Sequence, residues 1–293
     1  MLSGYLYALI VSILFALYLV PRKFSTLPTE KYVMFVTLGF FIPAVLQCFA
    51  LDDPHALLDP TALLLVLVGI SWMAAFALVT LSMDKIGLSR SNQWQNLKNP
   101  IAVILSLSVL SEHRITNIFI VLAAAALIFV SAVLFSIKKD SEKAFDMRGV
   151  YLALGAAFLF GVNSVLLKYA TMNVTEIAPQ QFYLSGGAFL SAFALLYWKE
   201  KALPAAETVF SRNCALALSA GVLYFVANYF RILSNQIIPN SIAATIVQFS
   251  VVWTVLIGIL VFKEIDMRKH WKRVLSGLVL AVLSIAVLFF GMR

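Results

Sequence analysis

The chain has 293 residues, of which 62% are hydrophobic and 12% charged, and its mean hydropathy is +0.94. Soluble domains carry roughly 25% charged residues, so this composition excludes a water-soluble globular fold and makes lipid the solvent for most side chains. The net charge of +8 does not indicate nucleic acid, because the basic residues lie at the ends of apolar segments, where they set topology and meet lipid headgroups.

Apolar segments long enough to cross the hydrocarbon core follow one another along the whole chain. In lipid the backbone must satisfy its own hydrogen bonds, so we expect these segments to be helices. The breaks between them carry charge or proline, as at Asp52-Asp53-Pro54 and Lys138-Lys139-Asp140. The predicted spans are residues 3–21, 32–51, 61–83, 87–110, 115–137, 149–170, 177–198, 212–235, 238–262 and 273–292.

Basic residues are distributed unevenly between the two sides that these spans define. Most of the 22 lysines and arginines fall in the loops after the first, third, fifth, seventh and ninth spans. The positive-inside rule places those loops in the cytoplasm, which leaves both termini outside. We expect an integral, multi-pass protein of a bacterial or archaeal inner membrane.

The two halves of the chain resemble each other. Identical residues recur at an offset of 145 in the first span of each half, and at an offset of 152 in the third and fourth spans. Five spans is an odd number, so the second half must enter the membrane inverted. We predict an all-α membrane protein of ten transmembrane helices, with five-helix repeats at residues 1–137 and 149–293 and a cytoplasmic linker at 138–148. The matched pairs include Gly4 and Gly149, Phe15 and Phe160, Ser82 and Ser234, and Glu112 and Glu264.

On these features the chain resembles the drug/metabolite transporter superfamily, with its EamA-type ten-helix fold. The resemblance lies in the two repeats, the regions around Phe15 and Phe160, and the glutamates that end the fourth and ninth spans. The segments at residues 20–23 and 87–89 are similar to the glucose/ribose porter group. The resemblance implies secondary transport of a small metabolite by alternating access. Substrates of the superfamily range over sugars, amino acids, nucleotide derivatives and drugs.

The fourth span contains the most polar stretch within any predicted helix. At about 100° per residue, four of its amides share one face. Polar side chains inside a span are costly and mark candidate pathways. This face therefore lines a central cavity or forms hydrogen bonds with a neighbouring helix. The four amides are Asn92, Gln95, Asn96 and Asn99.

Other spans add candidate substrate-binding residues. The eighth span carries a polar stripe and its repeat partner, the third, an aromatic stripe, although an aromatic stripe is as often plain packing. A cavity with one polar and one aromatic wall suits a small polar ligand such as a sugar or an amino acid. The ninth span, and a pair of repeat partners in the first and sixth spans, contribute further polar groups. These candidates are Tyr224, Asn228, Arg231, Trp72, Phe76, Thr245, Gln248, Tyr18 and Asn163.

Lys98 is a cation placed inside the fourth span, about 16 Å deep at 1.5 Å per residue. A lysine at the centre of a span costs roughly 2.5–3.5 kcal/mol. All 14 acidic residues lie in loops or at span ends, so none is placed to pair with it. Two hypotheses have equal weight. Either Lys98 meets a carboxylate or phosphate of the substrate in an aqueous cavity, or it snorkels or contacts carbonyls near Pro100.

The sequence does not favour the other classes of membrane protein. It contains no HExxH, GxSxG, CxxC or Walker motif and no histidine within a predicted span, so we expect no catalytic residue, metal or cofactor. A channel would need a filter repeated by symmetry. A broad-specificity efflux exporter stays open as an alternative, and a membrane-embedded enzyme less so. The expected partners are a small-molecule substrate and membrane lipids, not nucleic acid, and the expected unit is a monomer or homodimer.

Overall fold

The fold is helical throughout the part of the chain that the computed structural model describes. That part comprises residues 2–50, 63–86, 91, 94–95, 97–112, 117–134, 146–174, 176–201, 206–209, 211–261 and 267–291, and no strand occurs within it. The predicted all-α class is thereby confirmed. Most of the predicted linker at 138–148 lies outside the described residues.

Every helix except the short α10 overlaps a segment that was predicted to span the membrane, and several extend beyond its predicted ends by two to six residues. The first half contains α1 (Leu2–Leu17), α2 (Val20–Phe24), α3 (Thr29–Cys48), α4 (Leu64–Ile86), α6 (Lys98–Val109) and α7 (Ile118–Leu134). The second half contains α8 (Met147–Asn173), α9 (Ile177–Glu200), α10 (Ala206–Val209), α11 (Arg212–Ile237), α12 (Asn240–Val247), α13 (Ser250–Leu260) and α14 (Met267–Gly291).

Several helices have the length and hydropathy of membrane spans. Among the described residues, 6 helical stretches meet both criteria, while α6 and α7 are apolar but shorter. A multi-pass membrane protein is therefore supported, and the count of ten spans stays a prediction. The six stretches are Leu2–Phe24, Thr29–Cys48, Leu64–Ile86, Met147–Met172, Arg212–Ile237 and His270–Leu288.

Three segments predicted as single helices are interrupted within the described residues. In the fourth span, α6 begins only at Lys98, after a turn in which Leu97 N–H bonds to Trp94 O at 3.2 Å. The first span breaks between α1 and α2, where Pro21 has no backbone N–H to continue the helical ladder. The ninth breaks between α12 and α13. There Phe249 N–H bonds to Ile246 O at 2.9 Å and Val251 N–H to Gln248 O at 3.0 Å. These three-residue spacings tighten the backbone locally, a geometry that often marks a hinge.

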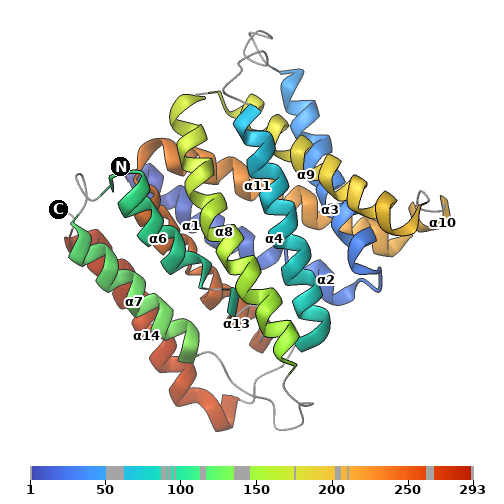
Figure 1. Cartoon of the computed structure of the whole chain (residues 1–293). Coiled ribbons are helices and arrows are strands. Elements are labelled where there is room, and N and C mark those ends of the chain that lie inside the picture. Colours follow the sequence, from blue (N-terminus) through green and yellow to red (C-terminus); the bar gives the residue numbers. More distant parts are fainter. Residues whose placement is uncertain are drawn as a thin grey trace.

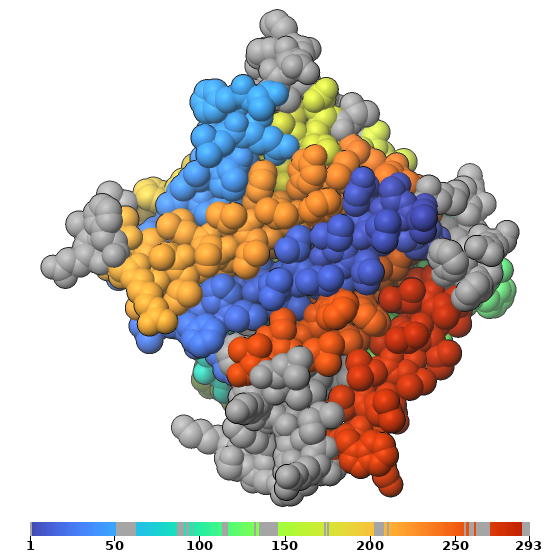
Figure 2. Space-filling model, turned by 180° about the vertical axis from the view of Figure 1, so that it is seen from behind, coloured from blue at the N-terminus to red at the C-terminus, as the bar shows by residue number. Residues whose placement is uncertain are grey.

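The long helices pack in two layers. The near layer in Figure 1 contains α4, α8, α6 and α7, with α9 packed against α4. Figure 2 shows the opposite face, where α1 runs between α11 and α13, and α14 lies beside α13. At the edge of this layer, α3 packs against α11. Each layer combines helices from both halves of the chain. Neither half therefore forms a separate packed unit.

The closest helix crossings occur as matched pairs. A Cβ at Gly69 of α4 would lie 2.0 Å from Leu184 O of α9, and a Cβ at Gly221 of α11 would lie 2.1 Å from Val36 O of α3. Only glycine allows backbones to approach this closely. A second pair repeats the relationship, with Gly187 against Val66 O and Gly39 against Leu218 O, each at 2.3 Å.

Buried serine hydroxyls form matched contacts as well. Ser82 Oγ donates to Gly149 O at 2.8 Å, joining α4 to α8. Ser234 Oγ donates to Gly4 O at 3.0 Å, joining α11 to α1. Both serines and both glycines are pairs that the sequence comparison had aligned. The two halves therefore use the same residues for the same helix contacts.

Candidate functional site

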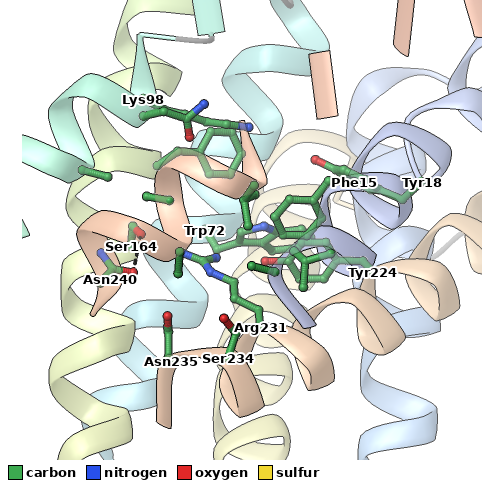
Figure 3. A pocket seen from close by; sticks show the side chains of 18 residues that line it. Phe15, Tyr18, Trp72, Lys98, Ser164, Tyr224, Arg231, Ser234, Asn235 and Asn240 are labelled. Atoms are coloured by element: carbon green, nitrogen blue, oxygen red, sulfur yellow. Dashed lines mark hydrogen bonds between the residues drawn. The ribbon is translucent and has the colours of Figure 1, made fainter. Parts of the chain in front are cut away.

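A central pocket of about 50 Å³ lies between the two layers. Six helices contribute to it, namely α1, α4, α6, α8, α11 and α12, and Tyr18 enters from the break after α1 (Figure 3). Both halves of the chain therefore build the same cavity. Its lining residues are Ala8, Val11, Phe15, Tyr18, Trp72, Lys98, Asn99, Ala102, Phe160, Ser164, Tyr224, Arg231, Ser234, Asn235, Asn240, Ala243, Ala244 and Val247.

One wall of the pocket is aromatic. The rings of Trp72 and Tyr224 lie 4.2 Å apart between centroids. Phe15 stacks on Tyr224 at 5.7 Å with an interplanar angle of 5°, and Tyr18 lies 5.4 Å from Tyr224. Such rings present flat, polarisable faces to a ligand, and Tyr and Trp also carry a polar tip. This wall can pack against the C–H face of a sugar ring.

Two cations, Lys98 and Arg231, line the pocket and enter it from opposite sides of Trp72 (Figure 3). Lys98 Nζ lies 5.2 Å from the centroid of the Phe160 ring, within the range of a cation–π contact. Among the residues that the structure describes, no acidic side chain lines the pocket or forms an ion pair with either cation. The pocket therefore has a positive electrostatic character.

The start of α12 is held at one end of the pocket by hydrogen bonds to α8, to α6 and to Glu112, which follows α6. Asn240 accepts from Ser164 Oγ at 3.2 Å (Figure 3) and donates through Nδ2 to Ser106 Oγ at 2.7 Å. The carboxylate of Glu112 accepts from the backbone N–H of Asn240 at 2.7 Å and of Ser241 at 2.9 Å. A carboxylate at this position satisfies N–H groups that the helix itself leaves unpaired.

Two buried amides in the pocket wall have unused hydrogen-bonding capacity. Neither Nδ2 nor Oδ1 of Asn235 has a partner within the described ranges, and the same holds for Nδ2 of Asn99. The two side chains are 1% and 5% exposed, respectively. Buried polar groups of native proteins are normally paired. These amides are therefore available to a polar ligand.

The structure brings part of the predicted set of binding residues together at this pocket. The candidates that line it come from the break after α1 and from α4, α6 and α11, which are far apart in the sequence. They are Tyr18, Trp72, Lys98, Asn99, Tyr224 and Arg231.

Other candidates contact protein groups instead of lining the pocket. Phe76 stacks on Trp72 at 5.2 Å. Asn163 Nδ2 donates to Val68 O at 2.6 Å and Ser71 Oγ at 2.9 Å. Asn228 Nδ2 donates to Gln181 Oε1 at 2.8 Å, and Thr245 Oγ1 to Ser241 O at 2.9 Å.

The remaining amides of the predicted set are two glutamines and two asparagines. Gln95 and Gln248 are fully buried outside the pocket lining, with no side-chain partner in the described part of the chain. Asn92 and Asn96 lie outside the described residues.

Sequence reasoning did not place several lining residues in the site. Phe15 and Phe160 had been matched as repeat partners, which was a usable signal. Asn235 lies seven residues after Asn228 on the polar stripe of the same helix. Asn240 had no such signal, because its position at the pocket depends on contacts with residues far away in the chain.

A helical membrane fold with a pocket that both halves of the chain build fits a membrane transporter of small polar solutes. Comparison with known families agrees with this class. A family model described as "Sugar transport protein" matches residues 113–290, which is more than half of the chain. The chain belongs to this sugar transport family. The family name is that of a transport protein, which is consistent with the prediction that the chain is not an enzyme.

Two relatives and one solved structure extend the comparison. Two candidate sugar uptake proteins, lmo0176 of Listeria monocytogenes and lin0215 of Listeria innocua, are each 22% identical to the chain over 261 residues, covering 87% of both partners. A protein of known crystal structure has 14% sequence identity to this chain and a TM-score of 0.76. The match covers 100% of this chain and 96% of that chain. At this identity the structural likeness concerns the fold alone.

Proposed function

We propose that this protein is a secondary transporter that moves a sugar across a bacterial membrane by alternating access. The observation that carries the proposal is the central pocket, where aromatic rings and unpaired amides from both halves converge. Aromatic faces pack on the apolar face of a sugar, while buried amides form hydrogen bonds with its hydroxyl groups. The family and the names of the Listeria relatives support a sugar as the solute.

The proposed architecture is the EamA-type arrangement of ten helices in two inverted repeats. Its support is the pairing of contacts across the halves. Gly69 and Gly221 each cross a helix of the other half, and the hydroxyls of Ser82 and Ser234 bond to equivalent glycine carbonyls. Two similar halves around one site can exchange conformations, which opens the pocket to each side in turn.

The small size of the pocket supports a moving transporter over a static pore. Ligand sites for small molecules commonly occupy about 300–1,000 Å³, whereas this cavity has about 50 Å³. A sugar can therefore enter only when helices separate. The helix breaks at Tyr18 and at Gln248 border or adjoin the pocket, and they are natural positions for such a movement.

Different contacts close the two ends of the proposed pathway. At the end that the charge distribution places outside, Glu112 caps α12. At the predicted cytoplasmic end, Arg22 forms an ion pair with Asp84 at 2.7 Å, and Thr29 Oγ1 donates to Asp84 at 2.6 Å. Alternating access requires these two sets of contacts to open at different times.

Counterflow in proteoliposomes tests the proposed function. Purified protein would be reconstituted with a millimolar sugar inside, and uptake of trace labelled sugar would be measured for glucose, galactose, ribose and their acid and phosphate derivatives. We expect saturable, counterflow-stimulated uptake for at least one of these sugars. Counterflow with none of them, from folded protein, would overturn the proposal.

A pair of variants connects that activity to the pocket. Ala102 lines the pocket and is 2% exposed, whereas Ala123 is exposed on α7. Ala102→Phe fills the cavity and is expected to abolish counterflow, while Ala123→Phe leaves it intact. Monodisperse elution of both variants would establish that they fold. Equal counterflow activity of both folded variants would show that the substrate does not bind in this pocket.

A further inference from the structure

We infer that the sugar carried by this protein bears a negative charge, as a carboxylate or a phosphate. The inference rests on the proposed function and specifies the substrate class of the same pocket. Its basis is the pair of cations, Lys98 and Arg231, that line the pocket with no acidic lining residue in the described part of the chain.

Lys98 differs from a structural lysine elsewhere in the same protein. Lys168 lies within α8, and its ammonium group donates to carbonyl oxygens at the end of α11, those of Asn235 and of Ile238, the latter at 3.1 Å. Lys98 instead has the Phe160 ring face as its contact. Within the described ranges the ammonium group of Lys98 has no assigned hydrogen-bond acceptor, which leaves its N–H donors available at the pocket that Lys98 lines.

The fold does not need a cation at either position. At the repeat offset of 152, Arg231 of α11 corresponds to Val79 of α4, and Lys98 of α6 corresponds to Ser250 of α13. Val79 is completely buried and packs as an apolar residue. The corresponding positions of the other half thus carry no charge. Lys98 and Arg231 are therefore charges that only one of each pair of matched positions carries, and both line the pocket.

The excess of positive charge in the pocket favours an anionic sugar over a neutral one. Lys98 and Arg231 are like charges that line one cavity, and like charges repel. A neutral ligand would leave both charges in a cavity with low dielectric constant, whereas an anionic group neutralises them through charge-assisted hydrogen bonds, which are roughly twice as strong as neutral ones. Carboxylate and phosphate share this chemistry.

The rest of the pocket fits the uncharged part of such a ligand. The aromatic wall of Trp72 and Tyr224 offers a surface for a sugar ring. Asn99 and Asn235 offer unpaired amide groups to hydroxyls. The chemistry of the lining side chains therefore suits a polyhydroxylated ring with one acidic substituent, such as a uronic acid or a sugar phosphate.

Sets of ligands that share a skeleton and differ in charge test the inference on the wild-type protein. Competition against the counterflow substrate would compare glucose with glucuronate and glucose 6-phosphate, galactose with galacturonate, and ribose with ribose 5-phosphate. We expect at least one acid or phosphate to compete at a concentration tenfold or more below that of its neutral partner. A preference for the acids identifies a carboxylate, and a preference for the phosphates identifies a phosphate.

Variants that remove one charge test whether Lys98 and Arg231 cause the preference for an anionic sugar. Lys98→Met and Arg231→Gln should each reduce the preference for the anion tenfold or more, with a much smaller change for the neutral sugar. Arg212→Gln is the matched control, because Arg212 lies on the same helix as Arg231 but is exposed at its far end. An unchanged preference in folded Lys98→Met and Arg231→Gln would overturn the inference.

The outcomes distinguish this inference from the function on which it rests. Counterflow of a neutral sugar that no matched anion inhibits would overturn the inference and leave the proposed function standing. Failure of every sugar, neutral or charged, to exchange would overturn both.

Discussion

The carboxylate of Glu112 caps the helix that begins at Asn240, accepting its backbone N–H at 2.7 Å. Glu112 follows α6 in the first half of the chain, and Asn240 starts α12 in the second. Asn240 also lines the pocket and accepts a hydrogen bond from Ser164. One carboxylate thus connects the two halves and positions a wall of the proposed binding site.

Removal of this cap should destabilise the protein. Glu112 is 3% exposed, and loss of a side chain that caps a helix costs about 0.5–2 kcal/mol. We expect Glu112→Ala to lower the unfolding temperature in detergent by several degrees. Glu176→Ala is the control, because Glu176 occupies the N-cap position of α9 without a side-chain cap bond. Equal melting of the two variants would show that the cap contributes nothing.

Adjacent glycines in α9 should respond very differently to the same substitution. A Cβ at Gly187 would lie 2.3 Å from Val66 O, whereas at Gly186 the nearest atom is a Phe41 ring carbon at 3.5 Å. Overpacking costs about 1–3 kcal/mol, so Gly187→Ala should lower the unfolding temperature. Gly186→Ala should leave that temperature unchanged or slightly raised. The reverse order would contradict the close crossing of α4 and α9.

Two asparagines on α11 should separate stability from ligand binding. Asn228 bonds to Gln181, so Asn228→Ala leaves a buried amide unpaired and should cost about 1–3 kcal/mol of unfolding free energy. Asn235 lines the pocket without a side-chain partner in the described structure, so Asn235→Ala should preserve stability and raise the KM for counterflow severalfold. Thermal unfolding and counterflow kinetics measure the two effects. A changed KM with normal stability for Asn228→Ala would indicate that Asn228 contacts the substrate, as predicted from the sequence.

The aromatic wall should contribute directly to affinity. Trp72 lies in the pocket, and an aromatic contact contributes about 0.5–1.5 kcal/mol beyond its buried area. Trp72→Phe keeps an aromatic face but removes contact area and the indole N–H, and a loss of this size should raise the Kd of the transported sugar by a factor of about two to ten. Trp198 is 77% exposed, so Trp198→Phe should bind as the wild type does. A Kd that is unchanged by Trp72→Phe would remove this ring from the site.

Some features of the candidate site could be read from local sequence. The polar stripe of the eighth span indicated Tyr224 and Arg231, and the depth of Lys98 marked it as exceptional. Both inferences use helical periodicity and the cost of charge in lipid, which act within a single segment. Repeat matching also related Phe15 to Phe160, and both line the pocket.

Other residues could not be assigned from a helical stripe. Periodicity places Asn228 and Asn235 on one face of α11 but does not identify their neighbours. The structure gives Asn228 a partner in α9 and places Asn235 at the cavity. The role of Glu112 likewise depends on a helix that begins 128 residues later.

Composition determined that this chain requires lipid, because its apolar side chains exceed what a soluble fold can bury. The length of its apolar segments determined that it is helical, because in lipid the backbone must satisfy its own hydrogen bonds. Tertiary structure alone decided which polar side chains pair with protein and which, like Asn99 and Asn235, have unpaired donors in the described part of the chain. The reason is that a hydrogen bond needs its partner within about 3 Å, and that distance is set by packing between segments far apart in the chain.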